Sequence, residues 1–240
     1  MAEYFSKDEF KDWYINHYTE FVSGTTTGEQ KGIVVLTDDI DLNGDRALRQ
    51  TGYISQNYFS GTFDGRGHVV SNMVTYAGPI PNVSEKGLIN NVAFVVFTEE
   101  YGWCGLLGAR FDRKMENCYF EGVDISTAVT IGEAVPNKTA FYQTVAGGVA
   151  SVKNVVVYSH DRVTDEIETT YGGMNGAYRA AQYYSNFYVI NTKCNGIKSK
   201  LNPEYLTTVQ LYSSLDEFRT NVTEIPSGFD TKYWEIGDNG

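Results

Sequence analysis

Met115-Glu116-Asn117-Cys118-Tyr119-Phe120 carries a pattern that recurs along the chain: apolar, any residue, Asn, apolar, any residue, apolar. Five copies occupy residues 70–75, 89–94, 115–120, 152–157 and 184–189, and only Thr75 departs from the pattern. Alternating inward and outward residues are typical of a β-strand with one buried face. The copies therefore predict a series of similar strands.

The Asn residues occupy the same position of each copy, at residues 72, 91, 117, 154 and 186. By subtraction they lie 19, 26, 37 and 32 residues apart, mostly within the range of roughly 20–50 residues per unit of repeat architectures. Asn is unfavourable inside ordinary strands. We expect these side chains to stack in register and to hydrogen-bond from repeat to repeat, because a buried amide needs partners.

A second recurring element consists of glycines around an apolar residue, and it precedes three of the Asn strands. It occurs at residues 102–108, 146–150 and 171–176. Glycine is required where a strand bends sharply or where neighbouring backbones approach closely. We therefore expect a corner of the chain at each of these places.

These motifs carry a family resemblance. Gly105-Leu106-Leu107-Gly108, followed by the Asn117 strand, resembles the GLUG motif, and residues 59–68 (FSGTFDGRGH) are similar to the FxGTFDGxGH segment that introduces such repeats. Residues 36–42 resemble the strand that these proteins place just before that segment. The resemblance covers roughly residues 33–190, and residues 147–150 depart from it because they lack the closing Gly.

GLUG-repeat proteins occur as bacterial surface and adhesin-like proteins and in bacteriophages. The resemblance implies a parallel β-helix and implies no catalytic residues. We therefore predict an all-β fold, a right-handed parallel β-helix (solenoid) over residues 32–190, with an N-terminal capping α-helix over residues 1–24. Residues 191–240 are predicted to form a C-terminal cap or docking segment.

Local patterns support this division of the chain. Ser6 and Glu9 form a capping box, followed at helical spacing by a broad apolar face made of Phe10, Trp13, Tyr14, His17, Tyr18 and Phe21. Residues 32–42 are a β-branched run that ends at a turn, Asn43-Gly44. Residues 201–211 favour a further strand, residues 214–217 a short capped helix, and residues 229–236 a packing cap or a docking strand.

Composition excludes several classes of partner. The 240 residues have a formal net charge of −11 and no cluster of Lys and Arg, so nucleic acid is not expected as a partner. No apolar stretch approaches the roughly 18 residues of a membrane span, and no signal-peptide core follows the N-terminus. We expect a product made in the cytoplasm, without membrane insertion. Cys104, Cys118 and Cys194 lack metal-ligand spacing and are interpreted as small core residues.

Four aspartates and three histidines are the candidates for chemistry, and structural roles account for most of them. Asp38, Asp39, Asp41 and Asp64 could supply the carboxylate pair of a glycosidase or ligands for calcium, yet each has a local explanation in a turn. His17 and His68 favour structural roles, whereas His160 lies at the end of a strand and is open to exposure. We predict no catalytic residue, no metal site and no cofactor.

The surplus of aromatic residues is the most function-like feature of the chain. Loops of a repeat protein collect on one face and form the usual binding surface, and aromatic rings stack on sugars. The alternative that these rings fill the core or a subunit interface is equally open. The candidate glycan- or partner-binding residues are Tyr101, Trp103, Tyr142, Tyr158, Tyr171, Tyr178, Tyr183 and Tyr184.

We therefore expect a non-enzymatic bacteriophage virion or surface structural protein whose loops attach to a host glycan or a partner protein. Its predicted partners are copies of itself, as a homotrimer by family analogy, and other virion proteins, with host surface polysaccharide as a ligand. The predicted location is the virion, with the cell surface as the alternative. Two other functions stay open: a polysaccharide depolymerase, either a glycoside hydrolase or a lyase, and a bacterial adhesin-like surface protein.

Overall fold

The computed structural model describes residues 2–13, 29–30, 32–44, 58–75, 82–83, 87–98, 110–111, 114–124, 151–159, 184–190 and 209–237. These residues form a mostly β fold with few helices, in agreement with the predicted all-β class. The described strands form two sheets, and every pairing within each sheet is parallel. Parallel neighbours require a crossover connection, so paired strands belong to different repeats of the chain.

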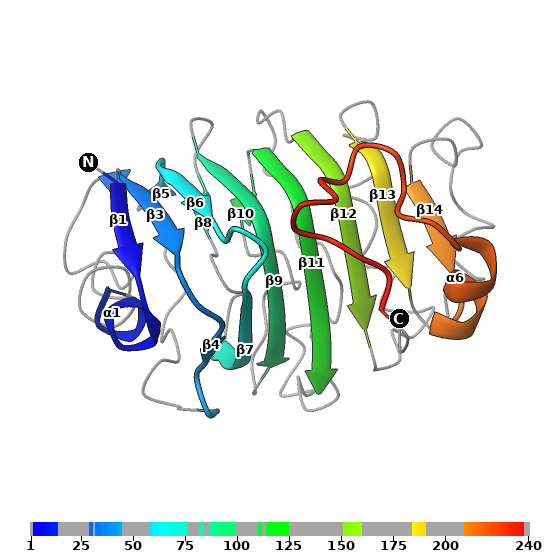
Figure 1. Ribbon diagram of the computed structural model, residues 1–240. Helices are drawn as coiled ribbons and strands as arrows, with labels where there is room; N and C mark the ends of the chain where they lie inside the picture. The colour runs from blue at the N-terminus through cyan, green and yellow to red at the C-terminus, as the bar shows by residue number, and fades with distance from the viewer. Residues whose placement is uncertain are drawn as a thin grey trace, which may run out of the picture.

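The larger sheet contains ten strands, which lie side by side in Figure 1. Its main path is β1 (Ala2–Phe5), β3 (Ile33–Leu36), β6 (Thr62–Asp64), β9 (Leu88–Thr98), β11 (Lys114–Asp124), β12 (Ser151–Ser159), β13 (Tyr184–Ile190) and β14 (Val209–Tyr212). Two further strands, β4 (Ile40–Asp41) and β7 (Val69–Thr75), pair with each other, and β7 also pairs with β9. The long strand β9 therefore adjoins β6 with its first residues and β7 with its later ones.

The smaller sheet has four strands of two residues each, in the order β10-β8-β5-β2. These strands are β2 (Glu29–Gln30), β5 (Tyr58–Phe59), β8 (Asn82–Val83) and β10 (Arg110–Phe111). The chain passes from this sheet to the larger one near Gly32, Gly61 and Gly87, whose carbonyls accept from Thr62, Leu88 and Lys114. A Cβ at Gly61 would lie 2.2 Å from the Gly32 carbonyl oxygen, so only glycine fits at this corner.

Large apolar side chains fill the concave side of the larger sheet. Phe63, Phe94 and Phe120 are at most 1% exposed. Their rings follow one another at centroid distances of 5.9 Å (Phe63 to Phe94) and 5.5 Å (Phe94 to Phe120). This aromatic column joins three successive repeats through their core.

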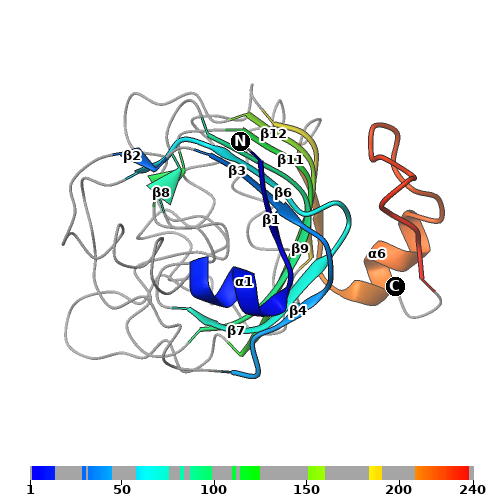
Figure 2. The same ribbon diagram turned by 60° about the vertical axis from the view of Figure 1, so that its left-hand side comes forward.

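The N-terminal residues close one end of this core. After strand β1, which pairs with β3, the helix α1 (Lys7–Asp12) lies on the concave side of the larger sheet (Figure 2). Phe10 and Trp13 are buried, and both rings contact Phe63 at about 6 Å between centroids. The capping box is confirmed, since the Ser6 N–H donates to the Glu9 carboxylate at 2.8 Å.

The prediction of a helix over residues 1–24 is wrong at its start, because residues 2–5 form strand β1. Pairing with β3 along four residues satisfies the backbone groups of this segment in place of a helical turn. The predicted helical positions Tyr14, His17, Tyr18 and Phe21 lie outside the described residues.

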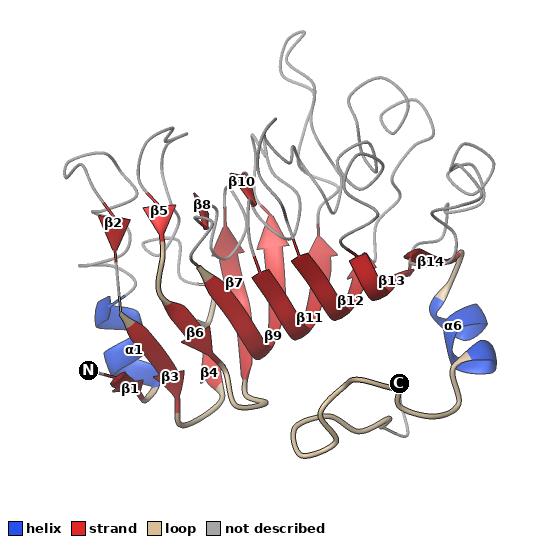
Figure 3. Ribbon diagram, turned by 90° about the horizontal axis from the view of Figure 1, so that it is seen from above, coloured by secondary structure: helices blue, strands red, loops and turns tan. Residues whose placement is uncertain are grey.

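The C-terminal residues follow the convex side of the same sheet. The predicted strand within residues 201–211 is confirmed for β14, and the predicted capped helix is α6 (Leu215–Asn221), where the Glu217 N–H donates to the Ser214 hydroxyl at 3.1 Å. Figure 3 shows α1 and α6 at opposite ends of the row of strands. Residues 222–237 continue without a helix or long strand and cross in front of β12 and β11 (Figure 1).

Candidate functional site

Each of the recurring Asn residues lies where the chain turns a corner. Asn72, Asn91, Asn117, Asn154 and Asn186 all have positive φ values, between 49° and 54°. This left-handed conformation is uncommon for residues other than glycine, and Asn is among the side chains that tolerate it best. The same conformation explains why Asn recurs where an ordinary strand would exclude it.

This corner changes the side-chain alternation. In β11, Met115, Cys118 and Phe120 are buried, whereas strict alternation would place Met115 and Cys118 on opposite faces. The left-handed residue Asn117 shifts the phase by one, so both flanking apolar residues face the core. The prediction of simple alternation through each copy is therefore wrong at the Asn.

Four of the Asn side chains form a ladder of hydrogen bonds. The Asn117 amide donates to Asn91 Oδ1 at 3.3 Å, the Asn154 amide to Asn117 Oδ1 at 2.9 Å, and the Asn186 amide to Asn154 Oδ1 at 3.0 Å. These bonds join residues 26 to 37 positions apart, one repeat to the next. The predicted stacking is confirmed for these four residues.

The first copy does not belong to this ladder. Asn72 donates instead to Asp41 Oδ1 at 2.8 Å, and Asn91 donates to Asp64 Oδ1 at 3.1 Å. Asn72 thus occupies a separate corner, and the 19-residue spacing from Asn72 to Asn91 is not a repeat length. The prediction that all five Asn residues share one stack is wrong, since β7 and β9 pair with a register shift between Val70 and Met73.

Two carboxylates accept from the first asparagine of each corner, Asp41 from Asn72 and Asp64 from Asn91. Asp41 Oδ1 also accepts the Asn43 N–H at 2.8 Å, and Asp64 Oδ1 accepts the Arg66 N–H at 3.1 Å. An ionised carboxylate can accept hydrogen bonds but cannot donate them. It therefore suits the start of a ladder in which every amide donates towards the preceding repeat. The amide of Asn72 and then the N–H of Asn43 lower the pKa of Asp41 below its usual value.

The two carboxylates share a local signal that the repeat pattern alone did not identify. Each begins a four-residue segment, Asp-Leu-Asn-Gly at 41–44 and Asp-Gly-Arg-Gly at 64–67, whose third residue has positive φ. Asp side chains commonly accept from the backbone two residues later. The aspartates at these positions are thus predictable from sequence as turn residues, as expected for Asp64.

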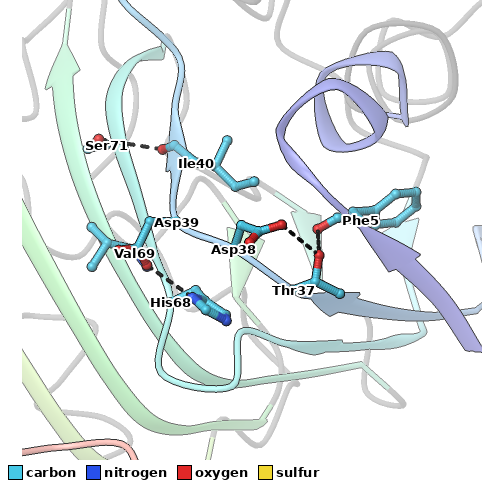
Figure 4. A network of polar contacts seen from close by, with 8 residues as sticks. All are labelled: Phe5, Thr37, Asp38, Asp39, Ile40, His68, Val69 and Ser71. Carbon is cyan, nitrogen blue, oxygen red and sulfur yellow. Dashed lines mark hydrogen bonds and ion pairs between the residues drawn. The ribbon is translucent and has the colours of Figure 1, made fainter.

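The other candidate carboxylates lie at the turn between β3 and β4 (Figure 4). Asp39 Oδ1 accepts from His68 Nδ1 at 3.1 Å and from the Val69 N–H at 3.0 Å. Asp38 accepts from the Thr37 hydroxyl at 3.0 Å. Asp39 and His68 therefore join two turns of successive repeats at the surface, where Asp39 is 73% exposed.

A separate polar pair, Tyr119 and Glu121 of β11, lies on the convex face of the sheet. The Tyr119 hydroxyl donates to Glu121 Oε2 at 2.9 Å. Burial and the neighbouring Glu121 charge raise the pKa of Tyr119 well above its ordinary value, so the phenol stays protonated.

Two members of the predicted aromatic binding set lie among the described residues. Tyr158 belongs to strand β12 and contributes to an apolar cluster with Tyr188, Ile190 and Tyr212 on the convex face. Burial raises its pKa. Tyr184 occupies the first position of β13. Tyr101, Trp103, Tyr142, Tyr171, Tyr178 and Tyr183 lie outside the described residues, as do the three predicted glycine corners and His160.

The described cysteine behaves as predicted. Cys118 is fully buried, and burial raises the pKa of its thiol to about 12. Cys104 and Cys194 lie outside the described residues. Among the described residues, no group of three or more His, Cys, Asp or Glu is placed to hold a metal ion. No helix in the described part of the chain is long and apolar enough to cross a membrane.

Comparisons with known proteins found no match. No protein-family model, no curated protein and no solved structure is significantly similar to this chain.

Proposed function

We propose that the chain is a right-handed parallel β-helix that serves as a non-enzymatic structural protein and presents its loops for attachment. The coils are supported by the parallel pairings in which Met115 lies between Ile89 and Val152, each one repeat away. The hand follows from the strong preference of parallel crossover connections for right-handed turns.

One observation carries the functional part of the proposal: the aspartates considered for hydrolysis accept hydrogen bonds that hold the turns of the chain in place. Asp41 accepts from the Asn72 amide, Asp64 accepts from Asn91 at the start of the ladder, and Asp39 binds His68 and the Val69 backbone. A general acid or base must exchange a proton with the substrate across a hydrogen bond. Each of these three carboxylates instead accepts two hydrogen bonds within the fold, at least one of them from the next repeat.

The resemblance to GLUG-repeat proteins supports a place for this structural protein on a bacteriophage virion, with other virion proteins and copies of the chain as partners. An acidic chain of net charge −11 suits an uncharged or weakly basic ligand better than a polyanion. The proposed ligand is a host surface glycan held by aromatic residues of the loops.

The test combines binding and cleavage on the purified chain. We expect retention on host cells or isolated surface glycan, loss of retention in Trp103→Ala with Tyr178→Ala, and unchanged retention in the control Phe218→Ala, whose ring lies in the convex apolar cluster and outside the predicted binding set. New reducing ends or unsaturated sugars, abolished in Asp64→Asn or Asp39→Asn, would overturn the proposal in favour of a depolymerase. Absence of retention on any host glycan or particle would also contradict it.

A further inference from the structure

The C-terminal segment touches repeats that are far apart in the stack. Residues 213–237, hereafter the clamp, begin after β14 and return along the convex face towards the N-terminal repeats (Figure 1). In a stack of repeats each unit normally contacts only its neighbours, and stability is a sum of such local terms. A segment that joins distant repeats adds a contribution to stability that depends on more than neighbouring repeats.

The first contacts of the clamp are aromatic. The Phe218 ring of α6 meets Tyr212 and Tyr188 edge to face, with centroids 5.2 Å and 5.9 Å apart. Phe229 lies further along the clamp, 6.4 Å from the Tyr188 ring. These contacts cover side chains of β13 and β14 that point away from the core, and Tyr188 and Tyr212 are buried as a result.

The second contacts are hydrogen bonds to the asparagine ladder. The Gly228 carbonyl accepts from the Asn154 amide at 2.6 Å, and the Ser227 carbonyl accepts from the Asn186 amide. Each of these amides also donates within the ladder, so both of its protons are used. A Cβ at Gly228 would lie 2.8 Å from Asn154 Oδ1, and its φ of 104° favours glycine.

The third contact lies several repeats away. Tyr233 packs on Gly67, where an added Cβ would come within 3.0 Å of the tyrosine Cβ. Gly67 belongs to the turn between β6 and β7, and its N–H donates to the Asn91 carbonyl. The clamp therefore connects β14, β13 and β12 to a turn that precedes β9 and β11 in the stack.

We propose that the clamp couples these repeats, so that the C-terminal repeats cannot unfold without also releasing the turn at Gly67. Without such a connection, opening would begin at the free end of the stack and spread one repeat at a time. With it, opening of β13 costs the contacts at Tyr233 as well. This coupling does not depend on whether the chain binds a glycan.

Hydrogen exchange followed by mass spectrometry tests the coupling. In Gly228→Val we expect exchange to rise about tenfold both in β12 and β13 and in residues 65–71, because local opening energies set exchange rates. Gly237→Val is the matched control, since a Cβ there meets nothing within 4 Å, and its exchange should equal that of the unmodified chain.

The reciprocal variant keeps the test independent of strain at Gly228. Tyr233→Ala removes the distant contact alone, and we expect it to raise exchange in β12 and β13 as well as beside Gly67, because coupling is mutual. Faster exchange confined in each variant to the residues next to the substitution would overturn the proposal.

Discussion

The two ends of the strand row are closed in opposite ways. At the N-terminal end, α1 enters the concave side, and Phe10 and Trp13 cover the aromatic column that starts at Phe63 (Figure 2). At the C-terminal end, α6 lies on the convex side and has no buried residue of its own. The first end is thus a plug inside the core, and the second is a cover over the outside of the sheet.

The asparagine ladder shows the same asymmetry. It begins at the Asp64 carboxylate and ends where backbone carbonyls of the clamp accept from Asn154 and Asn186. A plug is stabilised by full burial of apolar rings, whereas a cover relies on partly exposed rings and a few hydrogen bonds. The difference predicts that substitutions in the plug cost more stability than equivalent substitutions in the cover.

The largest effect is expected from Phe10→Ala. Phe10 is 1% exposed and contacts Phe63, so its removal leaves a cavity at the end of the core and should lower the free energy of unfolding by about 3–5 kcal/mol. Urea denaturation followed by circular dichroism measures the loss. Lys11→Ala in the same helix is the control, and equal losses in both variants would contradict the plug.

A smaller effect is expected from Asn117→Ala, in the middle of the ladder. The substitution removes hydrogen bonds to Asn91 and Asn154 and forces alanine into positive φ, with an expected cost of about 2–3 kcal/mol. Asn117→Gly retains the backbone freedom and should recover about 1 kcal/mol of that loss in the same denaturation experiment. Identical stability of the two variants would argue against a strained corner.

Phe218→Ala tests the cover. Because this ring is only partly buried against Tyr188 and Tyr212, we expect a loss of about 1–2 kcal/mol, less than for Phe10→Ala. Thermal unfolding of the two variants side by side measures the difference. A loss as large as that of the plug variant would remove the distinction between the two ends.

The smallest expected effect is on the loss of stability at low pH, through Asp41. Hydrogen bonds lower the pKa of Asp41 in the folded chain, so its contribution to stability is present above the ordinary aspartate pKa of about 3.9 and is lost as pH falls through the folded value. Asp41→Asn should therefore reduce the loss of stability between about pH 5 and pH 2. An unchanged pH profile of the melting temperature would contradict this role.

The sequence predicted the strand class and the stacking of four Asn residues because both follow from a repeated local pattern. It placed Asn72 with the other four because the same six-residue pattern serves two corners, which differ in the pairing of β7 with β4 and in its register shift against β9. A C-terminal cap with a short capped helix was predicted, but its contacts on the convex face could not be, since those of Phe218 and Tyr233 join residues that no periodicity relates.

The candidate site divides in the same way. Turn roles for Asp39, Asp64 and His68 were predictable from turn dipeptides and local spacing, but their partners lie one repeat away. The burial of Tyr158 depends on α6 and the residues after it, which are distant in sequence.

A double-mutant cycle on Asn117 and Asn154 tests the ladder most directly. The two residues are 37 positions apart, and their amides are joined at 2.9 Å. Ala substitutions at both should show a coupling energy of about 0.5–3 kcal/mol, as expected of groups in one hydrogen-bonded network, whereas the pair Asn72 and Asn91 should be additive. Additivity of Asn117 with Asn154, together with coupling between Asn72 and Asn91, would contradict the arrangement of the repeats described above.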